Sequence, residues 1–226
     1  MAARLSEFYE RAGRVQTKND ESGSVTVIGA VSPPGGDFSE PVTQNTLRIV
    51  KVFWALDSKL AQKRHFPAIN WLTSYSLYNR SLEGWYTENA GDEWNNSIAT
   101  AMSVLTEESK LQEIVQLVGS DALPVDQQLT LEVARMIREY FLQQNGFHEV
   151  DAFCSVDLHY KMAKAILTFQ ESAKSAMAAG AELQDVVNVP ARTELMRGRF
   201  ESTYTEEIDG LLNKMNEEIA AAIEEN

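Results

Sequence analysis

The first 76 residues alternate between helical, strand-like and turn-like patterns. Residues 2–12 place apolar side chains at the i, i+3, i+4 spacing of a helix, and Gly13 follows as a candidate C-cap. The β-branched run 24–31 and the nearly continuous apolar run 49–57 predict two strands. Between them, the segment 32–41 (SPPGGDFSEP) is dense in proline and glycine, which predicts a rigid, exposed turn. This mixture is typical of an α/β region.

After Leu77 the chain has helical periodicity and no convincing strand. The predicted helices cover 78–88, 93–118, 125–145, 159–179 and 203–225. Glycine or proline separates most of them, at Gly91, Gly119–Pro124, Gly146 and Pro190. The last helix has an apolar stripe with acids opposite, which indicates a core-facing or partner-facing helix. We therefore predict an α/β remnant over 1–76 followed by an all-α helical bundle over 77–226.

The α/β region is short for an independent domain. Each unit of a parallel sheet needs about thirty residues, and residues 1–76 contain only two strand-like runs. We therefore expect this sheet to be completed by residues upstream or by another chain.

Composition and charge exclude several classes of partner. The chain has 226 residues, of which 44% are hydrophobic, so it can bury a substantial core. Its net charge of −13 argues against binding to nucleic acid or to anionic lipid. No apolar run approaches the roughly twenty residues that cross a bilayer, and the start is amphipathic rather than a signal peptide. We expect a cytoplasmic protein with no direct membrane insertion.

Several separated segments carry a resemblance to a known family. The stretch 29–57, continued through 65–76 (HFPAINWLTSYS), resembles the catalytic A subunit of V-type and archaeal A-type rotary ATPases. Within it, Pro67–Ser76 is similar to the signature of rotary ATPase nucleotide-binding subunits, a proline-led segment that ends in Ser-x-Ser. The segments 3–15, 111–124 and 135–154 also resemble parts of this catalytic protein, in the same order. The resemblance covers nearly the whole chain and is weakest after Gly180.

The resemblance implies a role in a large complex. It identifies residues 1–76 as the C-terminal part of a P-loop NTPase domain and residues 77–226 as the helical C-terminal domain. The assembled enzyme would couple ATP hydrolysis or synthesis to translocation of protons (or sodium ions). Its implied partners are B subunits in an alternating A/B hexamer, the central rotor shaft and the peripheral stalk. The complex would hold the chain peripherally at the membrane.

The phosphate chemistry of that family has no counterpart in these residues. The pattern G-x-x-x-x-G-K-[ST], whose backbone and lysine hold the phosphates, does not occur in the sequence. In the family, this loop and the catalytic glutamate precede the segment that matches 3–15. We therefore expect ATP or ADP with magnesium in the full assembly, no catalytic or metal-ligating residue in this chain, and no activity of the chain alone.

Phe66, Pro67 and Phe147 are the predicted nucleotide contacts. The two phenylalanines match positions at which related subunits hold the adenine ring between aromatics, and base stacking contributes about 1–3 kcal/mol. The alternative is that each is an ordinary core aromatic. Pro67 restricts the backbone of Phe66 and would aim its ring, or it simply ends a strand or loop. Gly146 stands where the family more often has alanine, which would loosen the loop before Phe147.

Two acidic features also have competing interpretations. Asp57 ends an apolar run as the acid of a Walker B strand does, but SKLAQKR follows directly, which favours a helix N-cap. The turn 32–41 corresponds to a family loop that lies toward the rotor shaft, or it is a connection with no partner.

The histidines and two arginines carry no functional signal of their own. His65, His148 and His159 have no spacing that suggests a shared metal ion. Arg135 and Arg138 lie beside acids and are expected to be solvated or ion-paired.

Two other identities for the whole chain stay open at this stage. The first is a truncated, noncatalytic helical module that binds rotary ATPase subunits. The second is a β-type subunit of an F-type or export ATPase, which FSEPVTQ and HFPAINW fit less well than they fit the catalytic A type.

Overall fold

The computed structural model describes residues 2–224. It contains two compact units, each with its own internal packing. The first unit comprises Met1–Ala55 and Thr73–Asn79, and the second comprises Leu56–Leu72 and Arg80–Asn226. The segment 56–72 therefore belongs to the same compact unit as the helices, although it lies within the predicted domain 1–76.

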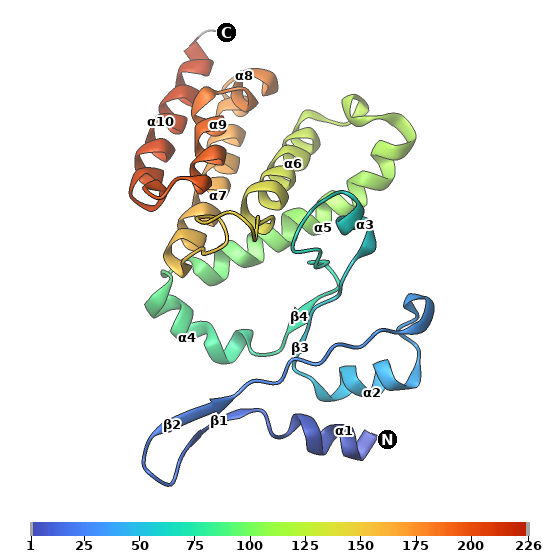
Figure 1. Cartoon of the computed structure of the whole chain (residues 1–226). Coiled ribbons are helices and arrows are strands. Elements are labelled where there is room, and N and C mark those ends of the chain that lie inside the picture. The colour runs from blue at the N-terminus through green and yellow to red at the C-terminus, as the bar shows by residue number, and fades with distance from the viewer. Residues whose placement is uncertain (1, 225–226) are drawn as a thin grey trace. The chain divides into compact units, whose positions relative to one another are not determined.

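The first unit combines short helices with two small antiparallel sheets (Figure 1). Its helices are α1 (Ala2–Tyr9), the 3-10 turn η1 (Pro34–Gly36) and α2 (Pro41–Ile49). The strands are β1 (Gly13–Gln16), β2 (Ser22–Val25), β3 (Val52–Phe53) and β4 (Tyr75–Ser76). In the pair β1–β2, Gly13 lies opposite Val25, and in the pair β3–β4, Val52 lies opposite Ser76.

The strands of this unit are shorter than the sequence predicts. Of the predicted strand 24–31 only residues 24 and 25 pair. In the run 49–57, Val52–Phe53 form β3 and Leu56 makes an isolated antiparallel bridge to Ile69. Because a strand is stabilised by backbone bonds to a neighbour, an apolar run without one adopts irregular structure. Gly13 begins β1, and α1 ends earlier, at Tyr9, so the predicted C-cap is wrong.

Helix α2 begins where the predicted turn ends, because Glu40 caps it. The side chain of Glu40 accepts hydrogen bonds from the backbone N–H of Thr43 at 2.9 Å and from its hydroxyl at 3.1 Å. Pro41 occupies the first turn, where a missing N–H costs nothing. These bonds satisfy donors that the helix itself leaves unpaired, and they hold the pKa of Glu40 below its usual value.

The second unit is helical, and residues 77–224 contain no strand. Its long helices are α4 (Asn79–Asn89), α5 (Trp94–Val118), α6 (Val125–Met136), α7 (Val156–Ala178) and α10 (Tyr204–Glu224). Shorter elements are α3 (Ser58–Gln62), η2 (Ser120–Ala122), the π-helical η3 (Ile137–Leu142), α8 (Leu183–Val187), α9 (Pro190–Arg197) and η4 (Gly198–Phe200). A remnant with small sheets followed by a helical domain is the predicted fold class, which is confirmed.

The helices α4, α5, α7 and α10 lie within three residues of their predicted ranges, and α6 starts at its predicted residue. The largest difference at a start is in α7, which begins at Val156 because Ser155 caps it and accepts the N–H of Leu158 at 3.1 Å. The predicted range 203–225 agrees with α10 as far as Glu224, and residue 225 lies outside the described residues. The short helices α8 and α9 were not predicted, because five and eight residues contain too few turns for a periodic pattern.

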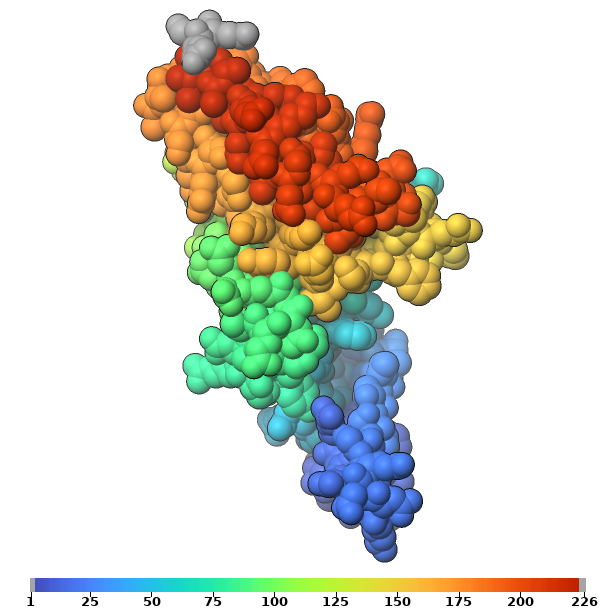
Figure 2. All heavy atoms as spheres, turned by 90° about the vertical axis from the view of Figure 1, so that its left-hand side faces the viewer, coloured from blue at the N-terminus to red at the C-terminus, as the bar shows by residue number. Residues whose placement is uncertain are grey.

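A large apolar core holds α5 to α10 together, and a second buried cluster, which includes Leu158, Leu195 and Ile208, joins α7, α9 and α10. The fully buried members of the large core come from several helices and include Leu129, Val133, Ile166, Phe169 and Met215. Helix α10 lies along α7 and α9 (Figures 1 and 2) and buries the predicted stripe. The stripe therefore faces the core. In the described residues 2–224, every helix is too short or too polar to span a bilayer.

Candidate functional site

Two loops of the second unit meet through their backbones. Residues 63–72 follow α3, and residues 143–155 separate η3 from α7. The backbone N–H of Gln144 donates a hydrogen bond to the carbonyl oxygen of Phe66 at 2.7 Å. Because the two loops are almost eighty residues apart in sequence, this bond is a tertiary contact that fixes one loop against the other.

The predicted nucleotide contacts lie on these two loops. Phe66 is 50% exposed and Phe147 is 102% exposed, so neither is a core aromatic. Neither ring is among the aromatic pairs that the described residues form. Pro67 follows Phe66 through a cis peptide bond. The structure thus joins the loops of Phe66 and Phe147 and leaves both rings accessible.

Asp57 holds the loop that carries Phe66. Its carboxylate accepts the N–H of Lys59 at 2.7 Å, which caps α3 as predicted, and the side-chain amide of Asn70 at 3.0 Å. Its own N–H donates to the carbonyl of Ala68 at 2.9 Å. The bond from Asn70 lowers the pKa of Asp57, partly opposed by burial. Asp57 is therefore a structural residue that closes the loop.

The residue before Phe66, His65, is buried and lies within the electrostatic influence of Arg138. Its ring lies 5.4 Å from that of Trp71. Burial lowers the pKa of His65, and the positive charge of Arg138 lowers it further. Arg138 pairs with Glu108 of α5 at 3.0 Å. Burial raises the pKa of Glu108, and Arg138 opposes that shift.

The second loop begins at a π-helical segment. The predicted helix 125–145 is α-helical only to Met136, continues as the π-helix Ile137–Leu142 and then ends. At its end, the N–H of Gln143 donates to the carbonyl of Arg138 at 2.9 Å, five residues back. A wider turn of this kind re-aims the residues that follow, and such turns are frequent at functional sites. Apolar periodicity does not distinguish it from an α-helix.

Phe147 is presented by a tight turn built on Asn145. The N–H of Phe147 donates to the side-chain oxygen of Asn145 at 3.1 Å, and the N–H of His148 donates to its backbone carbonyl at 3.1 Å. Asparagine is favoured in turns because its side chain can bond the backbone two residues on. The ring of Phe147 projects outward as a result.

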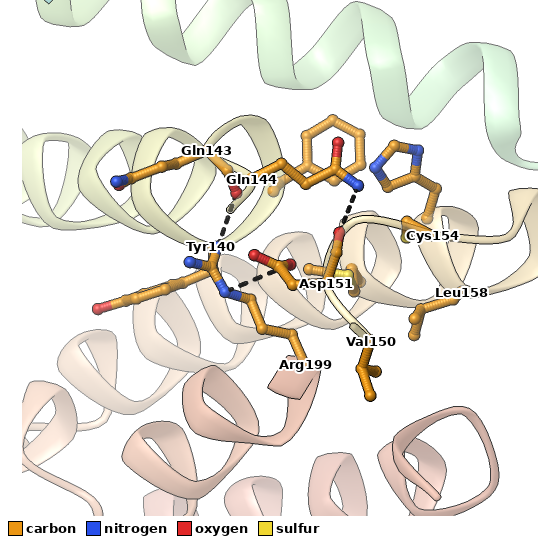
Figure 3. Close-up of a pocket in the computed structure, with 11 residues that line it drawn as sticks. Tyr140, Gln143, Gln144, Val150, Asp151, Cys154, Leu158 and Arg199 are labelled. Carbon is orange, nitrogen blue, oxygen red and sulfur yellow. Dashed lines mark hydrogen bonds and ion pairs between the residues drawn. The ribbon is translucent and has the colours of Figure 1, made fainter. Parts of the chain in front are cut away.

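Asp151 closes the base of this turn (Figure 3). Its carboxylate accepts the N–H of Asn145 at 2.6 Å, and its carbonyl accepts the side-chain amide of Gln144 at 2.8 Å. Arg199 lies beside it, with 3.8 Å between Nε and the carboxylate. The cavity among these residues is ≈ 10 Å³, room for about one water molecule. A nucleotide could therefore contact only the outer face of the loop.

Sequence reasoning missed Gln144, Asp151 and Arg199. Asn145-Gly146 is a turn signal that marks the loop itself. Arg199, 48 residues after Asp151, has no local pattern that connects it to the loop. Tertiary structure alone brings it there.

The turn at Gly146 yields a stability prediction. Gly146 lies outside the left-handed region, and a Cβ added there meets no atom within 4 Å. Gly146→Ala is therefore expected to raise the free energy of unfolding by about 0.4–1 kcal/mol, because alanine restricts the unfolded chain more than glycine does. Urea unfolding measures this change. Gly119→Ala is the matched control: its Cβ is equally free of contacts, but φ is +85°, so it should destabilise. Equal effects of the two variants would contradict the prediction.

The turn 32–41 of the first unit is ordered by its own residues. Gly35 and Gly36 have φ of 65° and 74°, which favours glycine at both positions. The carboxylate of Asp37 accepts the N–H of Ser39 at 2.9 Å, and hydrogen bonds with Ser39 lower the pKa of Asp37. Most of the segment is exposed. The predicted exposed turn is confirmed, whereas contact with a rotor stays a prediction.

No metal centre is evident in the described part of the chain. Among residues 2–224, no three histidine, cysteine, aspartate or glutamate side chains gather as a metal-ligand set. The site instead consists of two exposed aromatic rings on loops that buried polar groups hold in place. Such an arrangement can stack a planar ring.

Two family models match consecutive parts of the chain. Residues 1–76 match the nucleotide-binding domain of the ATP synthase alpha/beta family. Residues 83–187 match the C-terminal domain of V and A type ATP synthase.

Curated relatives extend the match to almost the whole chain. The A subunit of the A-type ATP synthase of Methanoculleus marisnigri is 59% identical, and that of Methanoregula boonei is 58% identical, each over 98% of this chain. The chain spans 38% of the length of these relatives. A solved structure, a unique ATP synthase subunit NeqB from Nanoarcheaum equitans, has the same fold with a TM-score of 0.62. It is 22% identical and covers 75% of this chain and 39% of its own.

The sequence identity to these relatives extends over nearly all residues. The fold agrees with it, since a part with small sheets precedes a helical domain. The chain therefore belongs to the family of A-type ATP synthase A subunits, and it carries part of their nucleotide-binding domain followed by their C-terminal domain.

Proposed function

We propose that this chain works as part of the catalytic A subunit of a rotary ATP synthase. The assembled enzyme would couple ATP synthesis or hydrolysis to the translocation of protons (or sodium ions). The partners would be neighbouring B subunits, the central rotor shaft and the peripheral stalk. Through this complex, the chain would be held peripherally at the cytoplasmic face of the membrane. The names of the relatives support this proposal, although the chain spans 38% of their length.

Within that enzyme, Phe66, Pro67 and Phe147 would form the adenine-side wall of the nucleotide site. The observation that carries this assignment is the 2.7 Å bond from Gln144 to the carbonyl of Phe66, which joins the two loops while both rings stay exposed. An exposed phenylalanine ring offers a face on which a base can stack. Because stacking uses the face of the base, such a wall would tolerate any purine.

The phosphates and magnesium would be held by residues outside this chain. The sequence lacks the P-loop pattern, and the described residues contain no metal-ligand set. Catalysis of phosphoryl transfer depends on positioning and charge around the phosphates. The chain alone is therefore expected to be inactive, which a phosphate-release assay with Mg-ATP would test.

Two structural roles accompany this proposal. The chain would consist of two family domains, a nucleotide-binding part over 1–76 and a helical domain over 77–226. Within the folded chain, residues 56–72 of the first domain pack with the helical unit. The ordered, acidic turn 32–41 would contact the rotor shaft. Its rigidity supports this role, because a stiff loop transmits force better than a flexible one.

Nucleotide binding is the direct test. The purified chain is expected to bind a fluorescent ATP analogue weakly, with equal affinity with and without magnesium. Phe66→Ala and Phe147→Ala should each weaken binding by about 1–3 kcal/mol, roughly fivefold to 150-fold, because a stacking face is lost. Phe153→Ala is the matched control, since Phe153 is 84% exposed and has no proposed contact with nucleotide.

The outcomes separate the candidate functions. Binding that Phe66→Ala and Phe147→Ala leave unchanged would contradict the adenine wall. If the folded chain binds no nucleotide but associates with the purified B protein of the hexamer, the noncatalytic interaction module becomes the better description. Phosphate release by the chain alone would contradict the proposed division of labour.

A further inference from the structure

Arg199 lies in the short segment η4, between the last two helices, and reaches back to the Phe147 loop. One guanidinium nitrogen, Nη1, donates to the carbonyl oxygens of Glu139 and Gln143, both at 2.7 Å. Its Nε lies 3.8 Å from the carboxylate of Asp151, an ion pair without a hydrogen bond. The side chains of Arg199 and Asp151 are 11% and 6% exposed.

These three partners bracket the residues that present Phe147. Glu139 lies in η3, Gln143 follows η3 directly, and Asp151 comes after the turn. Figure 3 shows the guanidinium pointing between the backbone at Gln143 and the side chain of Asp151. The carboxylate of Asp151 also accepts the N–H of Asn145. Arg199 therefore contacts the chain before the turn, at Gln143, and after it, at Asp151.

A second contact joins the same two regions. The ring of Phe200 lies 5.0 Å from the ring of His148, and the guanidinium of Arg199 lies 4.7 Å from the ring of Phe200. His148 in turn accepts the N–H groups of Val150 and Asp151 at 3.3 and 3.4 Å. Adjacent residues of η4 therefore support the Phe147 loop through charge and through ring packing.

We propose that Arg199 is a positioning residue that couples the Phe147 loop to helices α9 and α10. When α9 and α10 are displaced, the carbonyls of Glu139 and Gln143 lose their donor and the turn loosens. The guanidinium suits this role, because Nη1 donates to both carbonyls while Nε faces the carboxylate. A lysine ammonium has all its donors and its charge on one nitrogen and cannot hold both positions. The consequence for nucleotide affinity rests on the proposed role of Phe147, whereas the ordering of the loop does not.

The test compares two buried arginines changed in the same way. Arg199→Lys keeps the positive charge and removes the planar guanidinium. Arg192→Lys is the matched control: Arg192 is also buried, with Nη1 on the carbonyl of Val187 at 2.6 Å and Nη2 on Glu132 at 2.7 Å, and it does not contact the Phe147 loop. Amide hydrogen exchange at Asn145 and Phe147 reports loop order in each full-length chain.

Arg199→Lys is expected to speed exchange at these two amides about tenfold, because exchange there follows local opening. Binding of the fluorescent ATP analogue should weaken in parallel. Arg192→Lys should change both by less than about twofold, since distant sites are nearly independent. Equal acceleration in the two variants, or no acceleration in Arg199→Lys, would overturn the proposal.

A further variant keeps the test decisive. If Arg199→Lys does not fold, Asp151→Asn retains the shape of the side chain and removes the charge that faces Arg199. It should also accelerate exchange at Phe147, whose amide is not bonded to Asp151. Unchanged exchange in a folded Asp151→Asn chain would then overturn the proposal. Faster exchange in Arg199→Lys together with nucleotide binding that neither it nor Phe147→Ala alters would refute the adenine wall while leaving the positioning role intact.

Discussion

Replacing Phe169 with alanine is expected to lower the free energy of unfolding by about 3–5 kcal/mol. Phe169 lies in α7, has no exposed surface and belongs to the core cluster that α5 to α10 share. The substitution removes a whole ring from a closely packed interior, and neighbours on several helices cannot all move to fill the space. The lost transfer energy and the cavity therefore add.

Urea unfolding followed by circular dichroism measures this loss. Phe153→Ala is the matched control, because it deletes the same atoms from a ring that is 84% exposed, and its effect should stay within about 0.5 kcal/mol. A loss in Phe169→Ala no larger than in the control would mean that the core is not packed as described. The guanidinium of Arg192 also lies 5.0 Å from the ring of Phe169, so variants at these two positions should not be additive.

Replacing Glu132 with alanine should cost about as much, 3–5 kcal/mol, since it strips a buried charge of its partner. Glu132 of α6 accepts Arg192 at 2.7 Å and Arg135 at 2.6 Å. Arg135 can turn to solvent, whereas the side chain of Arg192 is 5% exposed and its Nε already lacks a partner. Without Glu132, the carbonyl of Val187 is the hydrogen-bond acceptor that residues 2–224 leave to Arg192.

The control for Glu132 is an exposed ion pair of the same chemistry. Glu194 pairs with Lys214 at 2.7 Å, and both side chains are about half exposed. Glu194→Ala should therefore cost only about 0–1 kcal/mol. If the two alanine variants lost equal stability, burial would not be what makes the Glu132 pair matter.

The Glu132 prediction also has a defined pH dependence. Burial alone would raise the pKa of Glu132, but the hydrogen bond from Arg192 and the charges of both arginines outweigh it and lower the pKa below its usual 4.5. A lowered folded-state pKa contributes stability that is present above 4.5 and is lost as the pH falls through the folded value. The difference between the parent and Glu132→Ala should therefore shrink on acidification. A difference that grows at low pH would contradict this assignment.

Local patterns were sufficient for most of the helical domain. The apolar stripe of α10 predicted a buried face, and Ile208, Met215 and Ile219 are almost fully buried. Helix α5 agrees with its prediction to within one residue, because a long periodic segment holds the signal over many turns. Asp57 was predicted as an N-cap from its own position and the residues after it, and capping is a local interaction.

The candidate site was predictable only in part. The resemblance to rotary ATPase subunits singled out Phe66 and Phe147, but nothing in the residues around them indicates that their loops share a hydrogen bond. The π-helical turn was missed because it arises where η3 ends against Arg199 and the adjoining loop, after an α-helical start.

The amino-acid pattern was enough to predict the family and the helices with long amphipathic stretches, and to show that these residues lack the P-loop pattern. Folding was needed to establish which apolar runs pair as strands, where α6 changes to a π-helix and how Arg199 reaches a loop 48 residues upstream. The two sets of features differ in the range of the interactions that form them. Helix periodicity and capping act between residues within a turn or two, whereas strand pairing and buried ion pairs require partners that the chain brings together only on folding.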